Sequence, residues 1–259
     1  MANVLDLPAH IDADTRRLVQ LVAAGDLSTP VTTCGDWTLA DLAAHVYEVQ
    51  HFWHWIVSQR ARSPKGYTEP ARPADAELAT ALDAGRELLV ATIRETDPST
   101  PCWSWAHSQT AGFTRRRQAH EALVHRIDAE MALNEVSPVD AELAADGVAE
   151  VLGVFAGETP EWGTFTAGDT SIRLSATDAP GTWTYRFGRM TGRSPETNKD
   201  YDLEAIEPDD TATPDAHVRA TAAELDLWLW GRDRGDGLRV EGDRDVVSRL
   251  RALVADATR

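Results

Sequence analysis

Between residues 120 and 125 the chain reads HEALVH, in a segment with the composition of a helix. Glu121 and His125 are four residues apart, so they lie on one face of that helix and can share one metal ion. The zincin protease motif H-E-x-x-H would need a second histidine at position 124, where Val124 stands. Glu121 is therefore better interpreted as a metal ligand than as a protease-type general base. His45 is our candidate for the third ligand.

Two histidines and one carboxylate leave the fourth position of a tetrahedral ion open, which is typical of a catalytic zinc site. On the expected helix Glu121 and His125 share a stripe with Arg117 and Asp128, so the carboxylate faces inward or into a groove. A divalent cation would remove the cost of burying it. The alternative is an ordinary ion pair between Arg117 and Glu121, with His125 as a hydrogen-bonded core histidine. The spacing alone does not choose between them.

The elements that must position these side chains are helices, which we predict throughout the first domain, residues 1–156. His45 falls on a stripe with Leu42, Val49 and Phe52, so it should lie in an inward-facing row. Thr38 forms a capping box with Asp41 at the start of this helix. The predicted helices span residues 11–24, 38–59, 75–95, 113–133 and 140–155.

After Gly157 shorter segments with alternating polarity predict an α+β domain over residues 157–259. Residues 194–215 are polar and contain proline, so we expect an irregular excursion there. The predicted strands are 171–175, 182–187, 217–221 and 238–241, and the predicted helices are 222–230 and 245–255.

The overall composition excludes several classes of protein. A formal net charge of -17 over 259 residues argues against nucleic acid or an anionic membrane as a partner. No apolar run is long enough to span a bilayer, and the N-terminus lacks the layout of a signal peptide. Cys34 and Cys102 are the only cysteines, and we expect both to be reduced. We therefore expect a cytoplasmic protein, either a monomer or a homodimer.

Three motifs in order resemble the mycothiol-dependent maleylpyruvate isomerase family. Residues 33–45 read TCGDWTLADLAAH, residues 112–130 read GFTRRRQAHEALVHRIDAE, and residues 227–232 read LWLWGR. The resemblance spans nearly the whole chain. It implies an α+β protein with a DinB-like four-helix bundle at its N-terminus and a small α+β C-terminal domain.

Carried over residue by residue, the resemblance implies that His45, Glu121 and His125 bind a divalent metal, usually Zn2+. It also implies that Arg232, in the second domain, reaches towards the active cleft. A guanidinium there could bind a substrate carboxylate, whereas the simpler interpretation is a surface arginine at a helix C-terminus. The sequence of residues 120–126 resembles the uncharacterised members of the family more than its true isomerases. The electrophilic substrate therefore stays open.

The resulting expectation is a metal-dependent enzyme with mycothiol as its thiol cosubstrate. The metal would convert the thiol to a thiolate, which attacks a small electrophile. If the thiolate is eliminated after rotation about the former double bond, the result is cis-trans isomerisation. If the adduct is retained, the result is S-transfer. The alternatives are a thiol-independent metal hydrolase and a non-catalytic module that binds a small ligand.

Five further residues have weaker signals. Asp128 could orient His125 or His45 by accepting a hydrogen bond, or simply pair with an arginine. Cys34 precedes a helix start, where a thiolate is stabilised, although a small buried residue is the plainer interpretation. Tryptophans could line an electrophile pocket or belong to the core. These tryptophans are Trp53, Trp103 and Trp105.

Overall fold

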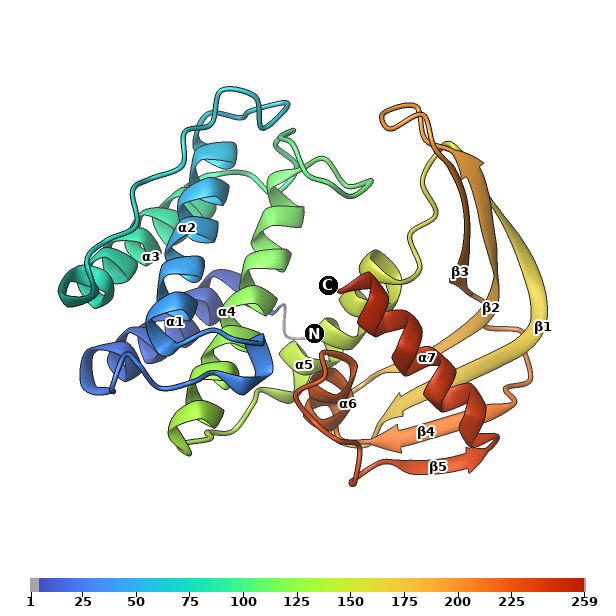
Figure 1. Ribbon diagram of the computed structural model, residues 1–259. Helices are drawn as coiled ribbons and strands as arrows, with labels where there is room; N and C mark the ends of the chain where they lie inside the picture. Colours follow the sequence, from blue (N-terminus) through green and yellow to red (C-terminus); the bar gives the residue numbers. More distant parts are fainter. Residues whose placement is uncertain (1–4, 259) are drawn as a thin grey trace. The chain divides into compact units, whose positions relative to one another are not determined.

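The computed structural model describes residues 5–258 (Figure 1). Helices and one five-stranded sheet make up an α+β fold, as predicted. Contacts within the chain divide it into two compact units, the first ending at Pro138 and the second beginning at Val139.

Four α-helices make up most of the described part of the first unit, and each packs against at least two others. The helices α1 and α2 both contact α3 and α4 (Figure 1). Apolar residues at helical spacing, such as Leu18, Leu42 and Leu82, are fully buried between them. The predicted four-helix arrangement is confirmed. The bounds are α1 Leu7–Ala24, α2 Leu39–Ser58, α3 Leu78–Glu95 and α4 Ala111–Leu133.

The two helices that carry the candidate ligands begin at well-formed caps. Before α2, Thr38 and Asp41 form the predicted capping box, in which each side chain accepts a hydrogen bond from the other residue's backbone N–H. Thr110 caps α4 by accepting from the backbone N–H of Phe113, and Asn134 ends this helix in the left-handed conformation. These caps fix where each helix starts and hence which face each ligand occupies.

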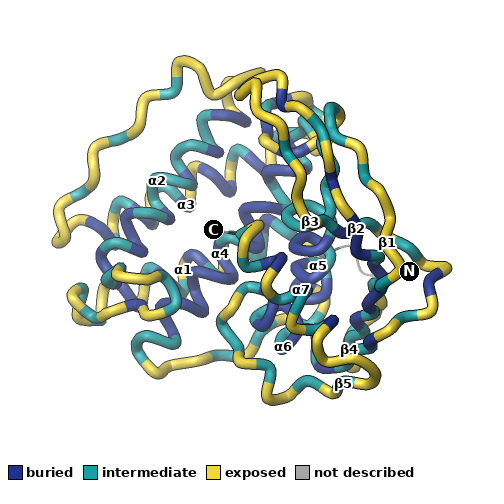
Figure 2. The backbone as a smooth tube through the Cα atoms, turned by 45° about the vertical axis from the view of Figure 1, so that its right-hand side comes forward, coloured by how far each residue is buried: buried dark blue, intermediate teal, exposed yellow. Residues whose placement is uncertain are grey.

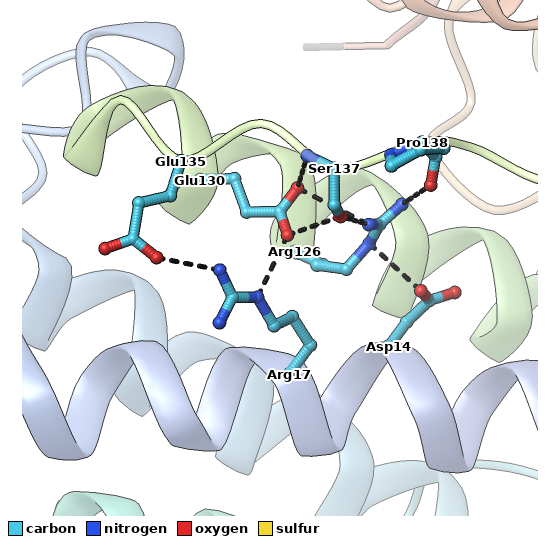
Figure 3. A network of polar contacts seen from close by, with 7 residues as sticks. All are labelled: Asp14, Arg17, Arg126, Glu130, Glu135, Ser137 and Pro138. Atoms are coloured by element: carbon cyan, nitrogen blue, oxygen red, sulfur yellow. Dashed lines mark hydrogen bonds and ion pairs between the residues drawn. The ribbon is translucent and has the colours of Figure 1, made fainter.

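A buried polar network anchors the C-terminal half of α4, as Figure 3 shows. The carboxylate of Glu130, fully buried, lies 3.1 Å from Arg17 on α1 and 3.4 Å from Arg126 on its own helix. Arg126 also lies 3.0 Å from Asp14. Ser137 donates its backbone N–H and its hydroxyl to Glu130, at 3.0 and 2.7 Å. The end of the first unit is thereby tied to α1 and α4.

The second unit begins with α5, which the sequence analysis placed in the first domain. In the structure α5 packs against α6, and its Val148 joins the core of the second unit. One π-helical turn, Val151–Phe155, follows it. The remaining bounds are α5 Ala141–Glu150, β1 Gly163–Ala176, β2 Thr182–Arg193, β3 Asp200–Pro208, β4 Ala216–Ala220, α6 Ala222–Leu229, β5 Arg239–Gly242 and α7 Arg244–Ala257.

The sheet has the strand order β3-β2-β1-β4-β5, with β1 and β4 parallel and the other neighbours antiparallel. The expectation of an irregular excursion over residues 194–215 was wrong, because β3 lies within it. This strand is at the edge of the sheet and only Ile206 is buried, so its sequence lacks the apolar alternation of a half-buried strand. Its exposed residues are yellow in Figure 2.

The helices of the second unit pack on the sheet through a single apolar core. Phe187, Ile172 and Leu174 of the sheet meet Leu225 of α6 and Leu250 of α7. Within residues 5–258 no helix is both long and apolar enough to cross a membrane.

Candidate metal centre

The structure brings His45, Glu121 and His125 together. Nε2 of His45 lies 3.3 Å from Oε1 of Glu121, and Nε2 of His125 lies 3.0 Å from the same oxygen. The two imidazole rings meet edge to face, with their centroids 5.1 Å apart. One donor atom from each residue can be chosen so that all three lie within 4.8 Å of one another.

Two helices of the first unit supply these donors. His45 comes from the second turn of α2, while Glu121 and His125 stand one turn apart on α4. The side chain of His45 is one-third exposed, at 33 %, whereas that of His125 is 11 % exposed. His45 therefore forms the accessible side of the group, where the sequence analysis expected an inward-facing row.

Asp128 and Cys34 surround His125 on its other side. Oδ2 of the fully buried Asp128 lies 3.0 Å from Nδ1 of His125 and accepts a hydrogen bond from the Cys34 thiol at 3.3 Å. An N–H at Nδ1 that donates to Asp128 leaves the lone pair of Nε2 facing Glu121 and His45. The carboxylate thus selects the tautomer of His125 that a metal ligand needs.

The charges of the group are balanced within it. Burial acts to raise the pKa of Glu121, but His125, His45 and Arg117 outweigh burial and hold the pKa well below its usual range. Burial acts to lower the pKa of His125, yet Glu121, Asp128 and Cys34 raise it well above its usual range. A divalent cation in place of the proton would satisfy the same carboxylates.

The ordinary ion pair weighed in the sequence analysis is also present. Nη2 of Arg117 lies 3.2 Å from Oε2 of Glu121, while Oε1 of the same carboxylate faces the two imidazoles. The two interpretations are compatible, because each uses a different oxygen of Glu121. The donor set of two imidazole nitrogens and one carboxylate oxygen fits a tetrahedral Zn2+ with an open position.

A hollow of about 240 Å³ opens beside His45 along α2. Its wall combines aromatic rings with two carboxylates, and the ring of Tyr67 stands edge to face with Phe52 at 5.0 Å. Burial, followed by the charges of Glu69 and Glu48, raises the pKa of Tyr67 to about 12. The residues that line the hollow are His45, Glu48, Val49, Phe52, Trp53, Tyr67 and Glu69.

Of the three tryptophans considered earlier, Trp53 lines this hollow. Trp103 stacks on Trp53 with ring centroids 6.0 Å apart and does not itself line the hollow. Trp105 is 46 % exposed and contacts Phe113. Sequence reasoning missed Tyr67 and Glu69, because they belong to the irregular segment after α2 and carry no periodic signal.

Arg232 lies in the second unit, directly after α6. Its backbone N–H donates to the carbonyl of Leu227 at 2.7 Å, and Nη1 donates to the carbonyl of Trp230 at 2.7 Å. These bonds hold the side chain close to the C-terminus of α6. This is the position of an arginine at a helix C-terminus, one of the two interpretations considered in the sequence analysis.

Two family models match the chain in order. Residues 9–130 match the mycothiol maleylpyruvate isomerase N-terminal domain, and residues 142–249 match the MDMPI C-terminal domain. No curated protein matches the chain.

Two solved structures share the fold. One is described as the crystal structure of the mycothiol-dependent maleylpyruvate isomerase, and the other as that of a histidine-to-alanine mutant of it. Their TM-scores are 0.54 and 0.53, each at 16 % identity and covering 91 % of this chain and 92 % of the other. At this identity the likeness establishes the fold, while the residues must be argued from the chain itself.

Proposed function

The chain belongs to the mycothiol maleylpyruvate isomerase family, and from this premise we propose that it is a metal-dependent enzyme acting on a small electrophile with mycothiol. The outcome is either cis-trans isomerisation of the maleylpyruvate type or transfer of the thiol to the electrophile. Both cysteines are free thiols, which suits a reducing compartment such as the cytoplasm.

The convergence of His45, Glu121 and His125 is the observation that carries the proposal. Three donors from two helices lie within 4.8 Å of one another, and the family's N-terminal model spans all three. A cation held there would keep at least one position for a reactant. When bound, a divalent metal such as Zn2+ would lower the pKa of a thiol that binds it, favouring the thiolate near neutral pH.

The chain's own side chains prepare the site for this chemistry. Glu121 presents Oε1 to both imidazoles while Arg117 holds Oε2, so the carboxylate is fixed in one orientation. Asp128 would hold the proton on Nδ1 of His125, so that a metal ion that displaces the other proton binds at Nε2. The buried surroundings limit access of water to the His125 side and leave the His45 side open.

The thiolate would add to a carbon of a cis double bond conjugated to a carbonyl. Rotation about the resulting single bond and expulsion of the thiolate give the trans isomer. Return of the proton released by the thiol to the carbon next to the carbonyl gives the stable thioether, which is S-transfer. We propose that a reactant enters through the hollow beside His45, because the side chain of this candidate metal ligand lines it. Arg232 would bind a carboxylate of the electrophile.

The test combines elemental analysis with a thiol-conjugation screen read by mass spectrometry. We expect about one Zn2+ or similar divalent ion per chain, and product formation that requires the added thiol. Glu121→Ala should lose most of the metal, whereas Glu95→Ala, at an exposed position at the end of α3, should retain it.

Full metal occupancy in Glu121→Ala would reject the ligand assignment. Turnover that persists without any thiol would favour a metal hydrolase, and a chain that takes up no metal would favour a module that only binds a small ligand.

A further inference from the structure

The hollow beside His45 follows one face of α2. His45, Glu48 and Phe52 are spaced i, i+3 and i+7 on this helix, so their side chains point to the same side. The segment after α2 adds Tyr67, whose hydroxyl lies 2.9 Å from Nδ1 of His51. All the residues that line the hollow belong to the first unit. A molecule that binds there contacts a candidate metal ligand directly.

The hollow carries two carboxylates that no cationic side chain neutralises. Glu48 and Glu69 line it, and within residues 5–258 neither forms an ion pair with a lysine, arginine or histidine. Among the described residues, no lysine or arginine lines the hollow. Arg72, three residues after Glu69, pairs with Asp41 at 2.8 Å instead. An anion in the hollow would therefore meet negative charge that no lining side chain offsets.

The pKa of Tyr67 shows the effect of these carboxylates. Burial is the largest cause that raises this pKa to about 12, and the charges of Glu69 and Glu48 come next. Because both carboxylates act on one hydroxyl group, they are close enough together to act on one ligand. An anionic ligand in the hollow would face the same repulsion as the ionised form of Tyr67.

Most of the remaining wall is aromatic. The ring of Phe52 stands edge to face with Tyr67 at 5.0 Å and with Trp53 at 5.2 Å. Aromatic rings pack against the C–H groups of a hydroxylated chain or ring, and carboxylates accept hydrogen bonds from its hydroxyl groups. This combination suits an uncharged, hydroxylated molecule.

We propose that the hollow binds the uncharged, hydroxylated body of the thiol cosubstrate, and that Glu48 and Glu69 select against thiols that carry a carboxylate. This assignment rests on the proposed function, because it assumes a thiol whose sulfur binds the metal beside His45. The selection is a difference in affinity that repulsion creates. An electrophile with a carboxylate would be repelled from the hollow in the same way, so the hollow belongs to the thiol.

Thioglycerol and mercaptolactate test the selection, because they differ only in a terminal alcohol against a carboxylate. Both are titrated into the full chain loaded with Co2+, whose absorption changes when a thiolate binds. At equal thiolate concentration, we expect thioglycerol to bind at least about tenfold more tightly. Propanethiol, which has no hydroxyl group, should bind about threefold more weakly than thioglycerol.

Glutamine variants separate charge from shape, since glutamine has nearly the shape of glutamate. Glu69→Gln and Glu48→Gln should each reduce the preference for thioglycerol over mercaptolactate by about threefold. Glu95→Gln, at an exposed position at the end of α3, removes the same charge far along the sequence from the hollow. It is the matched control and should keep the preference.

A second measurement needs no metal. Val49→Cys places a thiol in the hollow of a chain that also carries Cys34→Ala, and the remaining Cys102 is fully buried. Its rates of reaction with a cationic and an anionic alkyl thiosulfonate are compared with those of free mercaptoethanol. We expect the hollow to favour the cationic reagent at least about tenfold more than the free thiol does. Glu69→Gln and added salt should both reduce this preference.

Equal affinity for thioglycerol and mercaptolactate, or a preference that both glutamine variants retain in full, would overturn the selection. A cysteine at position 49 that reacts like the free thiol would overturn it as well. Tighter binding of propanethiol than of thioglycerol would reject the hydroxylated body. A chain that takes up no Co2+ or binds no thiol would reject the proposed function together with this assignment, whereas thiol binding without selection would reject this assignment alone.

Discussion

At the residue scale, we expect Asp128 to affect metal binding more than any other residue outside the three ligands, because one of its oxygens contacts both His125 and Cys34. It accepts from both His125 and the Cys34 thiol while fully buried. Asp128→Asn should weaken metal affinity by about tenfold, because a neutral amide holds the Nδ1 proton less strongly. Competition with a chromophoric chelator measures this change.

Cys34→Ala is the matched control. It removes the thiol but leaves the carboxylate that orients His125, so affinity should stay close to that of the parent chain. An Asp128→Asn variant with unchanged affinity would show that packing alone orients His125.

Arg232→Ala should separate substrate binding from metal binding. A permanently charged guanidinium cannot be a metal ligand, so metal content should stay the same. The melting temperature should change little, because Arg232 is only partly buried and its Nη1 donates to the nearby carbonyl of Trp230. Turnover of a carboxylate electrophile should fall by about 10²-fold in kcat/KM. Unchanged turnover would assign the residue to the cap of α6 alone.

The sequence predicted the candidate ligands better than their surroundings. The spacing of Glu121 and His125 depends only on helix geometry, and His45 was a candidate from its stripe on the preceding helix before the family resemblance implied it too. By contrast, Cys34 and Asp128 are 94 residues apart in the sequence, and nothing local indicates their contact. Such contacts depend on tertiary packing, which local periodicity does not encode.

At the element scale, the network around Glu130 holds α4 against α1. Glu130→Gln should lower the free energy of unfolding by about 3 kcal/mol, since it removes a fully buried charge that pairs with both Arg126 and Arg17. Denaturant unfolding at neutral pH checks this value. Glu135→Gln, an exposed partner of Arg17, is the control and should cost much less.

The same network gives a pH dependence. Burial acts to raise the pKa of Glu130, but Ser137, Arg126 and Arg17 together lower it below the ordinary 4.5. A lowered carboxyl pKa adds stability above the unfolded value, and this contribution is lost as the pH falls from about 4.5 through the folded value. The parent chain should therefore lose stability more steeply in acid than Glu130→Gln. Parallel slopes would exclude Glu130 as the source.

Helices and strands were predicted correctly where the local sequence pattern matches the residues that are buried in the structure. The capping box at Thr38 marked the start of α2, and the helices of the first unit follow their apolar periodicity. The edge strand β3 was missed because its side chains are mostly solvated, so its strand state depends on hydrogen bonds to β2. The location of α5 depended on its packing against α6, which no local pattern contains.

At the scale of the whole molecule, all three candidate ligands lie in one compact unit. A chain ending at Pro138 should therefore fold as a helical protein and bind metal, because its core and its donors are complete. Circular dichroism and elemental analysis measure the two properties. A chain ending at Asn134 should be less stable, because it loses the hydrogen bonds of Ser137 to Glu130.

The outermost strands of the sheet bear on how the protein behaves at high concentration. An open strand edge can pair with the edge of another molecule and start aggregation. Here β3 carries charged residues along its length and ends at Pro208, and β5 is only four residues long. Pairing of two β3 edges would bring the carboxylates of Asp200, Asp202 and Glu204 in two molecules close together, and like charges on paired strands are unfavourable. Polymerisation through the sheet is thereby opposed, so concentrated solutions should remain monodisperse unless these charges are removed.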